Sequence, residues 1–139
     1  MDYDSVSAED FGAGLRGLGI NFLVRDVRRT AAFLETVFEM KAHRLSGDFA
    51  IMVYGAQVFQ LHADGTYAGH PLQTMLPESP PRGLGVEIRL YDSDPDDAAR
   101  RAEPASGMVL APPADKPHGL REVFILDPDG YCWVASRPK

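Results

Sequence analysis

Apolar and polar residues alternate along residues 19–24, where every second residue from Ile20 onward is apolar. This alternation predicts a β-strand that is buried on one face. Asp26 then stands where the N-cap of a helix belongs, and residues 27–40 carry apolar side chains at helical spacing. The beginning of the pattern therefore predicts a strand followed by an amphipathic helix.

Short runs rich in β-forming residues come next, and clusters of turn-forming residues separate them. They predict three strands, at residues 42–45, 49–54 and 58–62. Residues 64–83 are rich in proline and glycine and show little periodicity, so they are predicted to be a linker.

The second half of the chain predicts the same order of elements. A strand with alternating polarity begins at Gly85, and Asp94 followed by Pro95 is a strong signal for the start of a helix. Three more strands are predicted at residues 108–111, 120–126 and 131–136.

A literal repeat supports this duplication, because the tetrapeptide Arg-Gly-Leu-Gly occurs at residues 16–19 and again at residues 82–85. We therefore predict an α+β fold of two paired β-α-β-β-β modules, residues 16–63 and residues 84–139, that form a curved sheet around a cup. Residues 1–15 are acidic and lack an apolar period, so we expect them to form a mobile N-terminal arm.

Strand alternation also indicates which polar side chains line the cup. If the larger apolar residues of each strand pack against the helices, then Asn21, Glu87 and Arg89 point the other way, into the cup. By the same reasoning Gln60 and His62 lie on the cup face. We take these five side chains as candidates for binding a ligand.

The composition restricts the class of partner. A net charge of -6 argues against a nucleic-acid surface, and no stretch approaches the ~20 apolar residues that cross a membrane. The single cysteine, Cys132, excludes an internal disulfide and suits a reducing compartment. We therefore expect a cytoplasmic protein that acts on a small molecule or binds a protein partner.

The module order, the Asp-Pro-Asp-Gly turn at residues 127–130 and the helix segment RDVRRTAAFLETVFEMK resemble the vicinal oxygen chelate superfamily. That superfamily groups glyoxalase I, extradiol dioxygenases and bleomycin-resistance proteins. The resemblance covers residues 17–136 and implies a homodimer whose ligand cup lies at the paired modules. In the metal enzymes it implies a divalent ion held by the first and last strand of each module.

The resemblance places the four metal-binding positions at Gly19, Gln60, Glu87 and Val134. Gly19 has no side chain and Val134 has no donor atom, whereas such sites need about four protein ligands. We therefore expect no metal and no other cofactor, and we count Val134 only among the ligand-binding positions.

Three functions agree with this pattern, and the sequence does not decide whether the protein is an enzyme. The first is metal-free binding of a small organic molecule, closest to the bleomycin-resistance branch. The second is a metal-dependent lyase, isomerase or dioxygenase with a rearranged site of Gln60 and Glu87, helped by His62 or Asn21. The third is a cofactorless enzyme in which Glu87 is a general base and Arg89 holds an anionic group.

A few further residues are weaker candidates. Arg121, just before the terminal hairpin, is a candidate for binding a carboxylate, although an exposed arginine at a strand end is the commoner outcome. Tyr54, Tyr91 and Met52 are predicted to form aromatic and soft walls of the cup. Cys132 is expected to be a buried, inert thiol.

Overall fold

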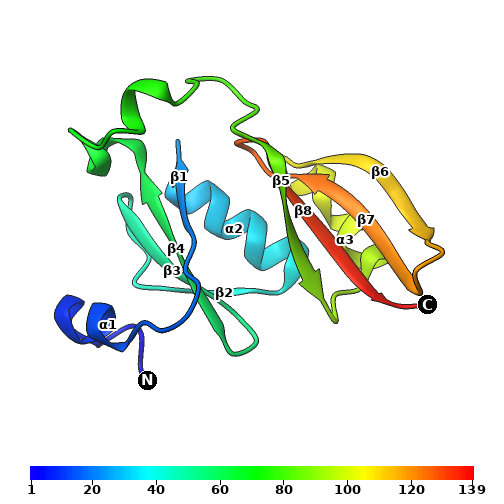
Figure 1. The fold of residues 1–139 in the computed structure, drawn as a ribbon, viewed down its shortest axis with the longest axis horizontal. Helices are drawn as coiled ribbons and strands as arrows, with labels where there is room; N and C mark the ends of the chain where they lie inside the picture. The colour runs from blue at the N-terminus through cyan, green and yellow to red at the C-terminus, as the bar shows by residue number, and fades with distance from the viewer.

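Two four-stranded sheets, each covered by a helix on one face, make up the molecule (Figure 1). The computed structural model describes the backbone of residues 1–139 and every side chain except that of Tyr67. The first sheet has the order β1-β4-β3-β2. Its strands are β1 (Asn21–Val24), β2 (Lys41–His43), β3 (Phe49–Tyr54) and β4 (Gln57–Ala63).

The second sheet repeats this topology with the order β5-β8-β7-β6. Its strands are β5 (Gly83–Tyr91), β6 (Met108–Asp115), β7 (Leu120–Leu126) and β8 (Tyr131–Pro138). In each sheet the first strand pairs in parallel with the last, and the other neighbours are antiparallel. The predicted α+β fold of two β-α-β-β-β modules is confirmed.

The two module helices begin where the sequence predicts. Helix α2 (Val27–Phe38) is capped by Asp26, whose side chain accepts a hydrogen bond from the Arg29 amide at 3.1 Å. Helix α3 (Pro95–Ala102) is capped in the same way by Asp94. In both helices the cap satisfies amide groups that have no partner within the helix.

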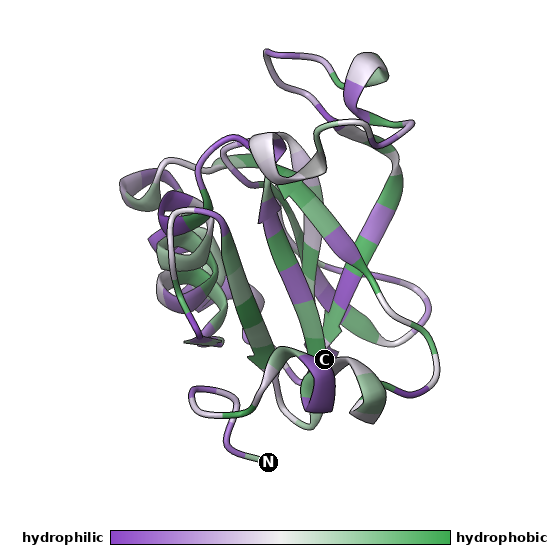
Figure 2. Cartoon of the chain, turned by 90° about the vertical axis from the view of Figure 1, so that its left-hand side faces the viewer, coloured by the Kyte–Doolittle hydropathy of each residue, from purple (hydrophilic) through white to green (hydrophobic). Residues whose placement is uncertain are grey.

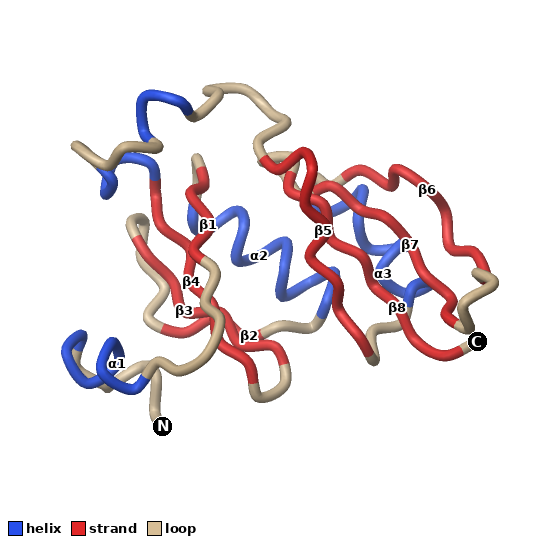
Figure 3. Tube along the Cα trace, in the orientation of Figure 1, coloured by secondary structure: helices blue, strands red, loops and turns tan.

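The segments outside the modules contain short helices that the sequence pattern did not predict. Helix α1 (Ala8–Gly14) lies within the N-terminal arm, and the linker contains the 3₁₀ turns η1 (Asp64–Tyr67) and η2 (Gln73–Met75). A third turn, η3 (Glu103–Ala105), extends α3. Figure 3 shows the linker as a mostly irregular segment that crosses from β4 to β5.

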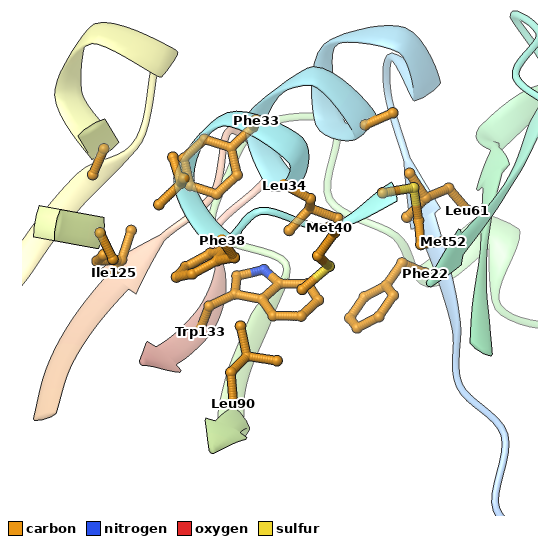
Figure 4. Packing of buried hydrophobic residues seen from close by; sticks show 14 of the residues in the cluster. Phe22, Phe33, Leu34, Phe38, Met40, Met52, Leu61, Leu90, Ile125 and Trp133 are labelled. Carbon is orange, nitrogen blue, oxygen red and sulfur yellow. The ribbon is translucent and has the colours of Figure 1, made fainter. Parts of the chain in front are cut away.

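One apolar core joins the two modules, because α2 contacts α3 and the helix-facing residues of both sheets belong to the same cluster. Figure 4 shows Trp133 of β8 among Phe22, Phe38 and Met40 of the first module, with Leu90 of β5 on its other side. Since each sheet turns its helix-covered face toward this core, the opposite faces of the two sheets point away from it. Figure 2 shows the alternation of apolar and polar bands along the strands that results.

The Asp-Pro-Asp-Gly turn between β7 and β8 ties the modules together. The Asp127 carboxylate accepts hydrogen bonds from the amides of Asp129 and Tyr131 at 2.9 and 3.0 Å, and from Trp133 Nε1 at 3.0 Å. The buried Asp129 carboxylate pairs with Arg25 of the first module, with 2.6 Å between Oδ1 and Nε. The turn therefore stabilises its own hairpin and also binds the second module to the first.

Candidate functional site

A cleft of about 900 Å³ lies between the β1–β4 side of the first sheet and strand β5 of the second. Three of the residues that the sequence proposed for the site line it: Gln60, Glu87 and Arg89. Gly19, one of the four metal positions implied by the resemblance, lines the same cleft. The structure thus brings side chains of both modules to one concave surface.

Aromatic rings form the floor of this cleft. The ring centroids of Phe22 and Phe59 are 5.5 Å apart, and the ring of Trp133 lies 5.2 Å from Phe22 and 5.7 Å from Phe59. Such a floor suits a planar, apolar part of a ligand. The sequence predicts Tyr54, Tyr91 and Met52 for this role instead.

Of those other residues, Met52 is fully buried in the core on the α2 side, so its prediction as a cup wall is wrong. Tyr54 does line the cleft, and its hydroxyl donates to the Tyr91 carbonyl oxygen at 2.5 Å. Tyr91 lines a separate, polar cavity of about 680 Å³ between the C-terminal end of α2 and the N-terminal end of α3. Met52 pairs with Phe59 in the register, but Phe59 is only partly buried and lines the cleft.

Arg89 lies between two carboxylates on the outer face of the second sheet. Its Nη1 is 3.5 Å from Oε2 of Glu87, and its Nη2 donates to the buried carboxylate of Glu122, which also lies 3.5 Å from His118 Nε2. Burial acts to raise the pKa of Glu122, but the hydrogen bonds and charges of Arg89 and His118 together outweigh it, so this pKa is lowered. Arg89 is therefore compensated by carboxylates and is poorly suited to hold an anionic ligand.

Glu87 stands at the rim of the cleft, with 48% of its side chain exposed. In the strand register it lies opposite Cys132 of the neighbouring β8. Burial raises the pKa of the Cys132 thiol, and the nearby Glu87 charge acts in the same direction. The thiol is therefore protonated and a poor nucleophile.

Gln60 shares its sheet face with His62 and Asn21, as strand alternation predicts. His62 Nε2 lies 3.0 Å from Gln60 Oε1, and Asn21 is opposite Gln60 in the parallel register. Burial lowers the pKa of His62, so the neutral ring donates this hydrogen bond at pH 7. Unlike Gln60, His62 and Asn21 lie beside the cleft rather than in its lining.

The residues present do not fit the metal site that the resemblance implies. Gly19, Gln60 and Glu87 meet at the cleft, but the fourth position, Val134, is fully buried next to Arg89 in the register. Among the side chains that the structure describes, no group of three or more His, Cys, Asp or Glu is placed to hold a metal ion. Only Gln60 and Glu87 could contribute donor atoms from these four positions.

Arg121 lies on the opposite face of the second sheet, so the structure does not support its candidacy for the cup. Its Nε and Nη2 each donate to Asp96 of α3 at 2.9 Å, and its Nη1 donates to Asp115 at 3.2 Å. These carboxylates raise the pKa of the guanidinium. Glu122, which the sequence analysis missed, is the residue of this segment on the outer face, as its contact with Arg89 shows.

The same part of the chain matches a known family. Residues 19–135 match the model of the Glyoxalase/Bleomycin resistance protein/Dioxygenase superfamily. No curated protein matches the chain. Within the part of the chain that the structure describes, no helix is long and apolar enough to span a membrane.

Solved structures of the same fold have low sequence identity to this chain. The hypothetical protein SA1046 from S. aureus is 19% identical with a TM-score of 0.72, and the match covers 92% of this chain and 98% of that protein. A glyoxalase/bleomycin resistance protein/dioxygenase family enzyme from Burkholderia phytofirmans PsJN is 18% identical with a TM-score of 0.71, covering 87% and 97%. A glyoxalase-related enzyme from Fulvimarina pelagi is 16% identical with a TM-score of 0.70, covering 88% and 87%.

Proposed function

Because the chain belongs to the glyoxalase/bleomycin resistance protein/dioxygenase superfamily, we propose that it binds a small, planar organic molecule in the cleft between its modules without a metal ion. The observation that carries this proposal is the composition of the cleft. Its floor is aromatic, and Gln60, Glu87 and Arg89 supply hydrogen-bonding groups at its rim. This combination of an apolar floor with a few polar groups is typical of small-molecule sites.

Metal independence is supported by the side chains at the four positions implied by family resemblance. Glycine and valine stand at two of them, and the two remaining donors are an amide and a carboxylate. A binding protein in the style of the bleomycin-resistance branch needs no metal, whereas a lyase or dioxygenase of this superfamily would need further donors. The single cysteine suits the reducing conditions of the cytoplasm, where we place the protein.

A role for Glu87 as a general base is less well supported. A base of this kind usually has a pKa raised by burial in a dry site, and Glu87 is about half exposed. We therefore assign Glu87 to ligand recognition.

We further propose that the protein forms a homodimer, because both modules leave an apolar edge strand open. β1 and β5 are outer strands of their sheets. Leu18 just before β1 is 92% exposed, and Leu84 and Val86 in β5 are 74% and 61% exposed. Open strand edges with apolar side chains are templates for pairing with another chain.

The duplication supports the geometry of this dimer. The two Arg-Gly-Leu-Gly segments precede or begin equivalent edge strands. A two-fold axis would place β1 of each protomer beside β5 of its partner, which satisfies both edges with the same contact. Leu18 and Val86 also line the cleft of one chain, so the partner would border that cleft.

Metal analysis tests the metal-free proposal directly. We expect purified protein to contain no stoichiometric divalent metal by mass spectrometry and to show no heat of tight binding when titrated with Mg²⁺, Mn²⁺, Ni²⁺ or Zn²⁺. Tight binding of one ion per chain, lost in Gln60→Ala or Glu87→Ala, would overturn it.

A neutral aromatic dye tests the cleft as the binding site. N-phenyl-1-naphthylamine gains fluorescence in apolar surroundings, and we expect Phe59→Ala to weaken its binding between about twofold and about tenfold, as loss of an aromatic contact does. Leu110→Ala, on an exposed apolar residue of β6, is the control and should leave binding unchanged. Equal effects of the two substitutions would show that the dye does not report on the cleft.

A further inference from the structure

The N-terminal arm has a defined fold of its own. Helix α1 begins after Ser7, whose hydroxyl accepts a hydrogen bond from the Asp10 amide at 3.0 Å. Phe11 is the buried residue of this helix, and the ring of Tyr3 meets it edge-on with 6.0 Å between centroids. The arm thus brings two aromatic side chains together.

A polar anchor holds the arm against the first module. Asp4 Oδ1 accepts a hydrogen bond from the Arg44 amide at 2.9 Å, and Asp4 Oδ2 lies 2.9 Å from His43 Nδ1. The hydrogen bond to His43 lowers the pKa of Asp4. The Tyr3 ring also contacts His43, with 5.7 Å between centroids, so charge and ring contacts fix the arm at the same point.

This position makes the arm part of the ligand cleft. Met1, Tyr3, Phe11 and Leu15 line the same cleft as Gln60 and Glu87, and α1 lies beside the first sheet (Figure 1). The family match begins at residue 19, so these residues are outside the part of the chain that the superfamily model describes.

We propose that residues 1–15 determine the ligand specificity of the cleft by forming an aromatic wall across from its floor. Tyr3 and Phe11 supply the wall, and Phe59 supplies the floor. The ligand class selected is a flat, uncharged aromatic molecule, because the lining that the arm contributes to the cleft is apolar. This inference rests on the proposed function, since it assumes that the cleft binds the ligand.

The anchor offers a test that leaves the lining of the cleft unchanged, since neither Asp4 nor His43 is among the residues that line it. We expect His43→Ala and Asp4→Asn each to weaken binding of N-phenyl-1-naphthylamine between about twofold and about tenfold, because the arm no longer holds its two rings in place. Glu9→Gln, an exposed change within α1, is the matched control and should bind the dye like the unmodified protein.

Trypsin cleavage after Arg16 reports the docking of the arm independently of the dye. We expect faster cleavage at this exposed arginine in the two anchor variants and an unchanged rate in Glu9→Gln. If the anchor variants are cleaved faster but bind the dye normally, the arm does not contribute to specificity and the inference is wrong. If they are cleaved at the normal rate, the anchor does not hold the arm, which equally overturns the inference.

The Phe59→Ala variant separates this inference from the proposed function. Weaker binding in Phe59→Ala together with normal binding in His43→Ala refutes the role of the arm and leaves the cleft in place. Normal binding in both variants refutes the cleft itself.

Discussion

At the scale of single residues, three buried carboxylates organise the second module. Asp127, Asp129 and Glu122 are each at most 5% exposed, and each has charged or hydrogen-bonding partners. Backbone amides and the indole of Trp133 surround Asp127, whereas arginines pair with the other two. Asp127 is thus the one of the three that lacks a direct cationic partner. Among the described side chains, no neighbouring positive charge offsets the effect of burial on its pKa.

The stability of the fold should therefore depend on pH through Asp127. Burial raises the pKa of Asp127 to about 6 in the folded state from the ordinary value of 3.8. A raised carboxyl pKa means that the folded state prefers the protonated form, so this group's favourable contribution is complete below pH 3.8 and is lost as the pH rises through about 6. We expect the free energy of unfolding, relative to that of Asp127→Asn, to fall by at most about 3 kcal/mol between pH 4 and pH 7.

Urea unfolding of the unmodified protein and of Asp127→Asn across this pH range measures the difference between their free energies of unfolding. Subtracting one from the other removes the contributions of other titrating groups. A difference that stays constant, or that grows with pH, would show that the hydrogen bonds to Asp127 hold it ionised throughout.

Arg121 and Glu122 show which side chains the sequence alone assigns to the correct face of a strand and which it does not. Alternation places Gln60 with His62 and Glu87 with Arg89 correctly, because the strands pair in regular register over these residues. Arg121 was proposed from its place near the hairpin, although alternation from the buried Val123 sets Glu122, and not Arg121, on the outer face. Partners such as Asp96 on another element could not be read from the sequence.

At the scale of elements, the strands and the two module helices follow directly from the pattern, and α1 does not. Asp26 and Asp94 are caps placed before periodic apolar residues, which makes α2 and α3 readable. Helix α1 has seven residues and one buried residue, Phe11, so it cannot show a period. The arm that carries it is held by contacts of Tyr3 and Asp4 with the distant His43, which only the folded structure displays.

The open edges of β1 and β5 lead to a prediction about assembly. We expect the protein, whose chain has a mass of 15.2 kDa, to sediment as a dimer, and Val86→Lys to shift it toward the monomer because a charge on β5 opposes strand pairing.

Leu110→Lys makes the same change on β6, the outer strand at the far side of the second sheet, and should leave the dimer intact. Sedimentation equilibrium checks both variants. Monomeric behaviour of the unmodified protein at every concentration would contradict the proposed dimer.

At the scale of the whole molecule, the modules are packed as one body. A side chain at Gly107, which precedes β6, would overlap the ring of Phe33 in α2 and would lie 2.9 Å from the Leu126 carbonyl oxygen. The first module thus packs against the backbone of the second at a point where only glycine fits.

Gly107→Ala should therefore lower the free energy of unfolding by about 1–3 kcal/mol, the usual range for overpacking a core. Gly47→Ala is the control, because a Cβ there meets nothing within 4 Å. Urea denaturation followed by both Trp133 fluorescence and circular dichroism checks the effect. Two separated transitions in the unmodified protein would contradict a single cooperative unit.

Two contacts between the modules restrict their motion relative to each other. Arg25 is bound to Asp129 across the modules, and the Tyr131 hydroxyl donates to the Leu23 carbonyl oxygen of β1 at 2.9 Å. Opening one module away from the other, as a hinge would, breaks this ion pair of the buried Asp129 and this hydrogen bond together. We therefore expect the two walls that carry Gln60 and Glu87 to keep a fixed spacing.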